Sequence, residues 1–295
     1  MAVIARPRRS VLYMPGSNAR ALEKGATLPA DGLILDLEDA VAPDAKALAR
    51  RQVVEAVTAG GYGSREVVVR INGLDTPWGK DDLAAVAHAG ADAVLVPKVE
   101  SAEMVHTVEG VLADAGAPAD MAIWCMMETP LGMLHAEAVA AAGPRVACLV
   151  MCTSDLAKDL HAQHTPDRLP FLTGLGLCLL AARAHGLAIL DGVHLDLADD
   201  EGFAAACRQG LELGFDGKTL IHPKTIEVAN RVFAPSAAEV ESSRKIIAAH
   251  AEATAEGKGM VLVDGKLIEN LHVENARRLV ALASTIAERQ VAAAR

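Results

Sequence analysis

The sequence predicts an α/β protein whose eight βα units close into a TIM (β/α)8 barrel, with a C-terminal helical extension. Its 295 residues, 52% of them hydrophobic, match the length of one such barrel plus an extension. Eight short runs rich in Val, Ile and Leu alternate with stretches of helix-forming residues, at intervals close to the roughly 30 residues of a βα unit. No GxGxxG motif follows the first run, which disfavours the doubly wound open sheet.

The predicted strands are short and largely apolar, as in a parallel sheet buried on both faces. In chain order they are Ser10–Met14, Leu33–Leu37, Val67–Ile71, Ala93–Pro97, Ala122–Met127, Ala147–Met151, Ala188–Leu190 and Gly217–Ile221. The stretches between them are rich in Ala, Leu, Glu, Lys and Arg, which have high helix propensity. The predicted helices are Ala19–Ala26, Ala42–Ala59, Lys80–Ala89, Ala102–Ala115, Leu131–Ala142, Thr173–His185 and Asp199–Leu213.

Two segments depart from the βα rhythm. The sixth unit carries a polar insert, His161–Pro170, on the side of the barrel where insertions shape substrate sites. After Pro235 the sequence predicts a long helix capped by Ser236, a hairpin around Asp264-Gly265 and a final helix, with the bounds Ala237–Glu256, Met260–Leu267 and Val273–Ala293. We therefore divide the chain into a barrel domain, residues 1–234, and an extension, residues 235–295. The extension has too little core to stand alone, so we expect it to dock on a neighbouring subunit.

Charge and composition exclude several classes of protein. The net charge is −10 and no Lys/Arg-rich run is present, which argues against a nucleic-acid-binding function. The five cysteines form no CxxC pair, which favours free thiols in a reducing compartment. No secretory signal is visible, and the most apolar window, Leu175–Leu190, contains Arg183 and His185 and is too short to span a membrane. We expect a cytoplasmic protein that does not bind membranes.

Ionisable side chains follow seven of the eight predicted strands. Barrel enzymes carry their catalytic groups where strands end and the next loops begin. Glu128 and Asp155 follow the fifth and sixth strands, and neighbouring strands are about 4.8 Å apart. Two carboxylates that leave positions open for water and substrate suit Mg²⁺. The alternative is that a nearby Arg or Lys neutralises them.

Arg70 has the same inward parity as Val68. Its guanidinium suits a two-point contact with a substrate carboxylate, and the alternative is a salt bridge to Glu38 or Asp39. Asp36 and Glu38 share parity, so both are expected at the barrel mouth.

Two basic residues at strand ends are candidates for more than one role. Lys98 is a candidate ion-pair partner for Asp36 and Glu38. His222 precedes a proline, so it is either a functional group or an ordinary turn residue.

Seven motifs at these strand ends occur in one order along the chain. They are RSVLYMPGSN (Arg9–Asn18), LDLEDAVAPDAK (Leu35–Lys46), VRINGLDTPW (Val69–Trp78), VPKVES (Val96–Ser101), METPLG (Met127–Gly132), SDLAKDL (Ser154–Leu160) and GFDGKTLIHPKT (Gly214–Thr225). Together they resemble the citrate lyase β-subunit-like (CitE-like) family of the HpcH/HpaI aldolase superfamily, which includes malyl-CoA and citramalyl-CoA lyases. The resemblance extends from Arg9 to about Arg278.

The resemblance implies a Mg²⁺-dependent carbon–carbon lyase. Glu128 and Asp155 would bind the metal, and Arg70 would hold the 2-oxo acid. The reaction implied is the reversible cleavage of a 3-hydroxyacyl-CoA into acetyl-CoA and glyoxylate or pyruvate. We expect the surrounding acids to orient metal-bound water and the arginine, namely Asp36, Glu38 and Asp39.

The resemblance also implies how coenzyme A (CoA) and the subunits are arranged. Tyr13 and Lys24 would contact CoA, and Ile221-His222-Pro223 would line the opening through which it enters. The family forms homotrimers, in which an acidic residue of the extension reaches the neighbouring active site. Glu269 occupies that position and would move the proton at the acetyl carbon.

Two departures from the family pattern bear on the reaction. Glu269 stands where the family has Asp, and the extra methylene moves the carboxylate by roughly 1.5 Å. Cys152 stands where the family has Gly, next to the metal-binding Asp155. Two alternatives to a lyase are a malyl-CoA thioesterase and a citrate-lyase-like β or accessory subunit that acts with an acyl carrier. Free malate as product would indicate the thioesterase, and glyoxylate or pyruvate the lyase.

Overall fold

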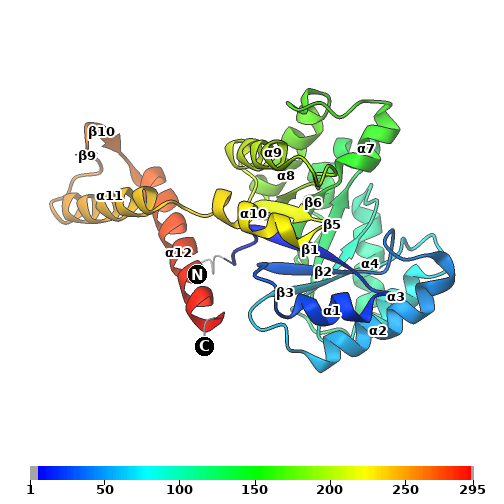
Figure 1. Cartoon of the computed structure of the whole chain (residues 1–295). Helices are drawn as coiled ribbons and strands as arrows, with labels where there is room; N and C mark the ends of the chain where they lie inside the picture. The colour runs from blue at the N-terminus through cyan, green and yellow to red at the C-terminus, as the bar shows by residue number, and fades with distance from the viewer. Residues whose placement is uncertain (1–5, 294–295) are drawn as a thin grey trace. The chain divides into compact units, whose positions relative to one another are not determined.

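The computed structural model describes residues 6–293 and divides the chain into two compact units. The first is Arg8–Phe233, and the second combines residues 6–7 with residues 234–293. The first unit contains a closed barrel of eight parallel strands in sequential order (Figure 1). These are β1 Ser10–Pro15, β2 Gly32–Asp36, β3 Glu66–Arg70, β4 Ala93–Val96, β5 Ala122–Met127, β6 Val146–Met151, β7 Ala188–Asp191 and β8 Gly217–Leu220. The predicted TIM barrel and all eight of its strands are therefore confirmed.

The strand register aligns the residues at the barrel mouth. Pro15 of β1 pairs with Asp36 of β2, which in turn pairs with Arg70 of β3, so these three lie at one level. The eighth strand ends one residue earlier than predicted, at Leu220, because His222 already begins the 3-10 turn η3 Pro223–Thr225. Proline has no backbone N–H to continue the ladder.

Side chains alternate between two cores along every strand. One set faces the surrounding helices, and the other fills the barrel interior around Trp124, the largest fully buried side chain. The interior set includes Val11, Val68 and Met126. Two residues further along the same strands, the same parity leads to polar side chains: Tyr13, Arg70 and Glu128. The alternation that builds the core therefore also aims these groups into the mouth of the barrel.

Helices cover the outer face of the strands (Figure 1). They are α1 Ala19–Gly25, α2 Lys46–Ala59, α3 Gly79–Val86, α4 Ala102–Asp114, α5 Pro130–Leu134, α6 Ala136–Ala140, α7 Thr153–Leu160, α8 Leu172–Ala184, α9 Asp200–Leu213 and α10 Ile226–Val232, with the 3-10 turns η1 Pro43–Ala45 and η2 Leu169–Phe171. The single helix predicted over Leu131–Ala142 is wrong. It breaks at His135, whose Nδ1 lies 2.7 Å from the carbonyl of Glu100 and whose backbone leaves the helical region. Helices α7 and α10 were not predicted, and only Cys152 lies between the end of β6 and the start of α7.

The second unit is built from two helices and a hairpin. Helix α11 spans Ala237–Ala255 and begins with a capping box between Ser236 and Glu239. Strands β9 Val261–Val263 and β10 Lys266–Ile268 pair in antiparallel fashion around Asp264 and Gly265, which both have positive φ, as a two-residue hairpin turn requires. Helix α12 Asn270–Ala293 packs against α11. The predicted helices and hairpin are thus present.

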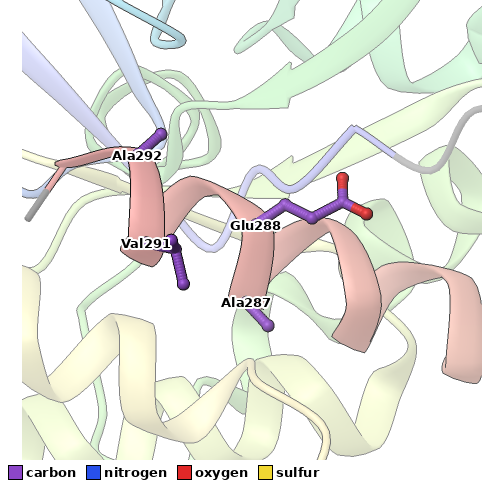
Figure 2. Close-up of a pocket in the computed structure, with 4 residues that line it drawn as sticks. All are labelled: Ala287, Glu288, Val291 and Ala292. Atoms are coloured by element: carbon purple, nitrogen blue, oxygen red, sulfur yellow. The ribbon is translucent and has the colours of Figure 1, made fainter. Parts of the chain in front are cut away.

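The surface of the second unit exposes several large apolar side chains. They are Met260, Leu262, Leu267, Leu271 and Val291. Figure 2 shows a pocket on α12, lined by Ala287, Glu288, Val291 and Ala292. Among the described residues, the lining of this pocket offers one carboxylate and no cationic group. None of the helices in residues 6–293 combines the length and apolar character needed to cross a membrane.

Candidate active site

Two carboxylates and a thiol meet at the ends of β5 and β6. Glu128 follows β5 directly, Cys152 follows β6, and Asp155 lies in the first turn of α7. One ligand atom from each of the three residues lies within 4.8 Å of the others. The structure therefore brings together the pair of acids singled out in the sequence, because paired neighbouring strands end at the same rim.

Glu128 is the most unusual member of this group, because it is a carboxylate with only 1% of its surface exposed. Its Oε1 accepts a hydrogen bond of 2.7 Å from the backbone N–H of Lys98. Burial and the nearby Asp155 raise the pKa of Glu128 to about 7, although the Lys98 amide acts in the opposite direction. Two acids held face to face in this way form a donor set suited to a hard divalent cation, which would neutralise both.

Lys98 contributes its backbone to this arrangement. Its φ is 50°, in the left-handed region that a non-glycine residue seldom adopts, and its N–H donates to Glu128. Its ammonium group is exposed and has no ion-pair partner within the described part of the chain, so the predicted ion pair with Asp36 or Glu38 is wrong. Partial burial acts to lower the pKa of Lys98, but Glu128 and Asp155 outweigh it and raise it.

Arg70 lies at the centre of a second cluster. Its Nε and Nη2 donate to the two carboxylate oxygens of Asp36, at 2.7 and 2.6 Å. Its Nη1 is 2.7 Å from Glu38 and 3.6 Å from Asp39. The salt bridges to Glu38 and Asp39, considered as an alternative from the sequence, are present, but the two-point partner of Arg70 is Asp36. The two-point contact expected for a substrate carboxylate is therefore made by Asp36.

The third nitrogen of Arg70, Nη1, does not contact Asp36 and donates a long hydrogen bond of 3.8 Å to the sulfur of Met126. Glu38 Oε2 is close to Nη1 but accepts no hydrogen bond, since the contact lies outside hydrogen-bond geometry. Burial raises the pKa of Glu38 to about 8, against the opposing effect of Arg70. Asp36, by contrast, also accepts from the backbone N–H groups of Glu38 and Ala40, so it holds both the guanidinium and the loop after β2.

The residues expected to contact CoA lie at the ends of β1 and β8 and on α1. The guanidinium carbon of Arg70 lies over the ring of Tyr13, 4.9 Å from the centroid of that ring. This tyrosine therefore faces the barrel mouth. Burial raises the pKa of its phenol. Lys24 is exposed in the last turn of α1, and Ile221 is 41% exposed beyond β8, which pairs with β1. Their contact with CoA stays a prediction.

His222 and Pro223 form a turn. The Nδ1 of His222 accepts a hydrogen bond from the backbone N–H of Lys224, 3.1 Å away, and so caps η3. The turn-residue interpretation of His222 is therefore confirmed, and a role in CoA binding stays a prediction.

Glu269 is exposed between β10 and α12. Its backbone N–H donates to Nδ1 of His272, and its carbonyl accepts from the N–H groups of His272 and Val273, which anchors the start of α12. Its carboxylate forms no ion pair among residues 6–293. The predicted role in a neighbouring active site therefore remains open.

Two further charged groups near the strand ends had no role assigned from the sequence. The ammonium of Lys46, which is 6% exposed, donates to the carbonyls of Leu37 and Glu38 at 2.8 Å and so holds the acidic loop. A signal existed, because Lys46 closes the LDLEDAVAPDAK motif. The strand-end Asp191 is held by Arg168 and Lys218, both at 2.7 Å, in a buried cluster on the helix-facing side.

Comparison with known proteins places these groups in context. Residues 9–223 match the model of the family described as HpcH/HpaI aldolase/citrate lyase. The chain is 52% identical to a (3S)-malyl-CoA thioesterase of Cereibacter sphaeroides, over 97% of this chain and 98% of the relative. It is 35% identical to an L-malyl-CoA/beta-methylmalyl-CoA lyase of the same species, over 96% of each.

The fold of this chain is also similar to that of a solved structure. CitE from Mycobacterium tuberculosis, in complex with magnesium, acetoacetate and coenzyme A, superposes with a TM-score of 0.75 at 29% identity, covering 95% of this chain and 98% of that one. The resemblance seen in the motifs is thus confirmed over almost the whole sequence. The chain belongs to the HpcH/HpaI aldolase/citrate lyase family of CoA-ester-processing enzymes.

Proposed function

We propose that the protein hydrolyses the thioester bond of malyl-CoA or a closely similar hydroxyacyl-CoA. The observation that carries this proposal is the 52% identity to a (3S)-malyl-CoA thioesterase over 97% of the chain, compared with 35% to a lyase. The site supports it, because its acids and arginine suit the hydroxy-acid end of such a substrate. The proposed activity is therefore thioester hydrolysis, and not the lyase reaction expected from the motifs.

Glu128 and Asp155 are the residues that would hold Mg²⁺. The fit rests on the donor set, since two acids lie within 4.8 Å of each other and burial raises the pKa of Glu128 to about 7. CitE of M. tuberculosis contains magnesium. Bound there, Mg²⁺ supplies Lewis-acid polarisation of substrate oxygens.

Arg70 would bind the substrate carboxylate through Nη1. Asp36 occupies the Nε and Nη2 positions and keeps the guanidinium plane fixed, which leaves Nη1 as the one guanidinium NH2 group that Asp36 does not bind. Glu38, which accepts no hydrogen bond from Nη1, would give way to the substrate. We place Glu38 and Asp39 as groups that orient Arg70 and local water.

Glu269 from a second subunit would take part in the proton transfer. It accepts a proton from a water molecule as the water oxygen adds to the thioester carbon; the carbon–sulfur bond then breaks, and the departing CoA sulfur takes up a proton. The net change is one water consumed and one carboxylic acid and one thiol formed.

A carbon–carbon lyase is the second candidate, because Arg70, Glu128 and Asp155 also match what a lyase needs to hold a 2-oxo acid. A subunit that acts with an acyl carrier is less well supported, since the relative with 52% identity is named for a free CoA ester. We further propose a homotrimer in the cytoplasm, where the five free cysteines remain reduced.

Product analysis separates these activities. With malyl-CoA and Mg²⁺, a thioesterase releases malate and free CoA in equal amounts and no glyoxylate. We expect this result, measured with a thiol reagent and a hydrazine assay on the same sample. Glyoxylate with acetyl-CoA and no free thiol would instead establish the lyase, and neither product without an added acyl carrier would favour the complex subunit.

Mixing two inactive variants tests the role of Glu269. Arg70→Ala and Glu269→Ala should each be inactive alone. After subunit exchange, some sites combine an intact Arg70 with an intact Glu269 from the next chain, so partial activity should return. The measurement is hydrolysis rate against mixing time, with exchange followed by a fluorescent label. Exchange without recovery would mean that Glu269 acts within its own chain or has no role.

A further inference from the structure

The thiol of Cys152 lies on the inner side of the rim, beside the two acids. It continues the inward-facing row of β6 that includes Cys148 and Val150. Its Sγ lies 3.3 Å from Oδ2 of Asp155, within the group of three atoms that also includes Glu128. Cys152 occupies the N-cap position of α7, yet its side chain makes no capping hydrogen bond, so the sulfur points toward the carboxylates rather than toward the helix backbone.

No other cysteine has this setting. The remaining four, Cys125, Cys148, Cys178 and Cys207, are buried, and none joins a group of three metal-ligating side chains in the part of the chain described. Thiolate sulfur is a ligand for thiophilic cations such as Zn²⁺, Co²⁺ and Cd²⁺, whereas Mg²⁺ takes oxygen ligands almost alone. A glycine in the position of Cys152, as in the family pattern, would leave an oxygen-only site.

We propose that Cys152 adds a sulfur ligand to the cation site of Glu128 and Asp155, so that this enzyme binds thiophilic divalent cations in competition with Mg²⁺. The inference rests on the proposed function only through those two ligands. As the sulfur–metal bond forms, the thiol gives its proton to solvent, and no electron is transferred. Mg²⁺ would bind the acids without the sulfur, so Cys152 sets which cations can compete rather than whether the site exists.

Cobalt titration of the metal-free full-length protein tests this. Under anaerobic conditions, Co²⁺ should produce a sulfur-to-metal charge-transfer absorption band that saturates at one equivalent per chain and disappears when excess Mg²⁺ is added. Cys152→Ser should lack the band, and its affinity for Co²⁺ relative to Mg²⁺ should fall at least tenfold. Cys152→Gly provides a second variant with the family residue, and Cys207→Ala is the matched control that should keep the band.

The variants of the acids distinguish two kinds of failure. If Glu128→Gln and Asp155→Asn lose both Co²⁺ and Mg²⁺ binding while the wild type binds Co²⁺ without a band, the ligands stand and the sulfur inference is overturned. A band that persists in Cys152→Ser overturns it as well. If both cations still bind the two acid variants unchanged, the proposed ligands themselves are wrong.

Discussion

Replacing either acid of the proposed metal site should abolish turnover. For Glu128→Gln or Asp155→Asn, we expect kcat to fall by roughly three orders of magnitude, because Lewis-acid stabilisation contributes several kcal/mol and each ~1.4 kcal/mol is a factor of ten. The fold should survive. Glu128 is a buried acid beside a second carboxylate, so the neutral amide removes like-charge repulsion in the metal-free protein. The measurement is steady-state hydrolysis with saturating Mg²⁺.

Thermal unfolding separates a ligand from a structural residue. Mg²⁺ should raise the Tm of the wild type, because a ligand that binds only the folded state stabilises it, and should leave the Tm of Glu128→Gln unchanged. Asp159→Asn, one turn later on α7 and paired within residues 6–293 only with Lys158, is the control and should behave as the wild type. Near-normal activity in either acid variant, or full activity after EDTA treatment, would refute the assignment.

Replacing the guanidinium of Arg70 by an ammonium should also sharply reduce activity. Arg70→Lys keeps the positive charge but cannot contact both oxygens of Asp36 while also presenting a nitrogen to substrate. It also leaves Asp36, which is 1% exposed, with fewer donors. We expect kcat/KM for malyl-CoA to fall about a hundredfold, on the order of the 3 kcal/mol assigned to a charge-assisted hydrogen bond. The inhibition constant of free CoA should change little.

Arg50→Lys is the matched control, since Arg50 also pairs with a buried aspartate, Asp82, at 2.6 Å, but on the outer, helix-covered side of the barrel. It should reduce the free energy of unfolding slightly and leave kcat/KM unchanged. If Arg70→Lys raised the inhibition constant of free CoA while kcat/KM for malyl-CoA stayed normal, the assigned role of Arg70 would be wrong.

The barrel could be predicted because its strands are encoded locally. Each of the eight runs is apolar and β-favouring, and their spacing leaves room for one helix each. The prediction of one helix over Leu131–Ala142 was wrong for a tertiary reason. The ring of His135 is hydrogen-bonded to the carbonyl of Glu100, a residue 35 positions earlier. Local propensity contains no information about such a contact.

The candidate site divides in the same way. Strand order by itself determined that Glu128 and Asp155 would meet, since adjacent parallel strands deliver their C-terminal residues to one rim. Parity determined that Arg70 faces inward. The motifs identify the family, and thereby the class of chemistry.

Only the tertiary structure decided which groups touch. Asp36, rather than substrate, takes the two-point contact of Arg70 because the register places the two residues at one level. Lys98 contributes its backbone N–H, which donates to Glu128, while its side chain is exposed. The thiol of Cys152 joins the acids because α7 begins directly after β6 and brings Asp155 back beside it. These outcomes depend on distances of an ångström or two between residues far apart in the chain, which residue order alone does not specify.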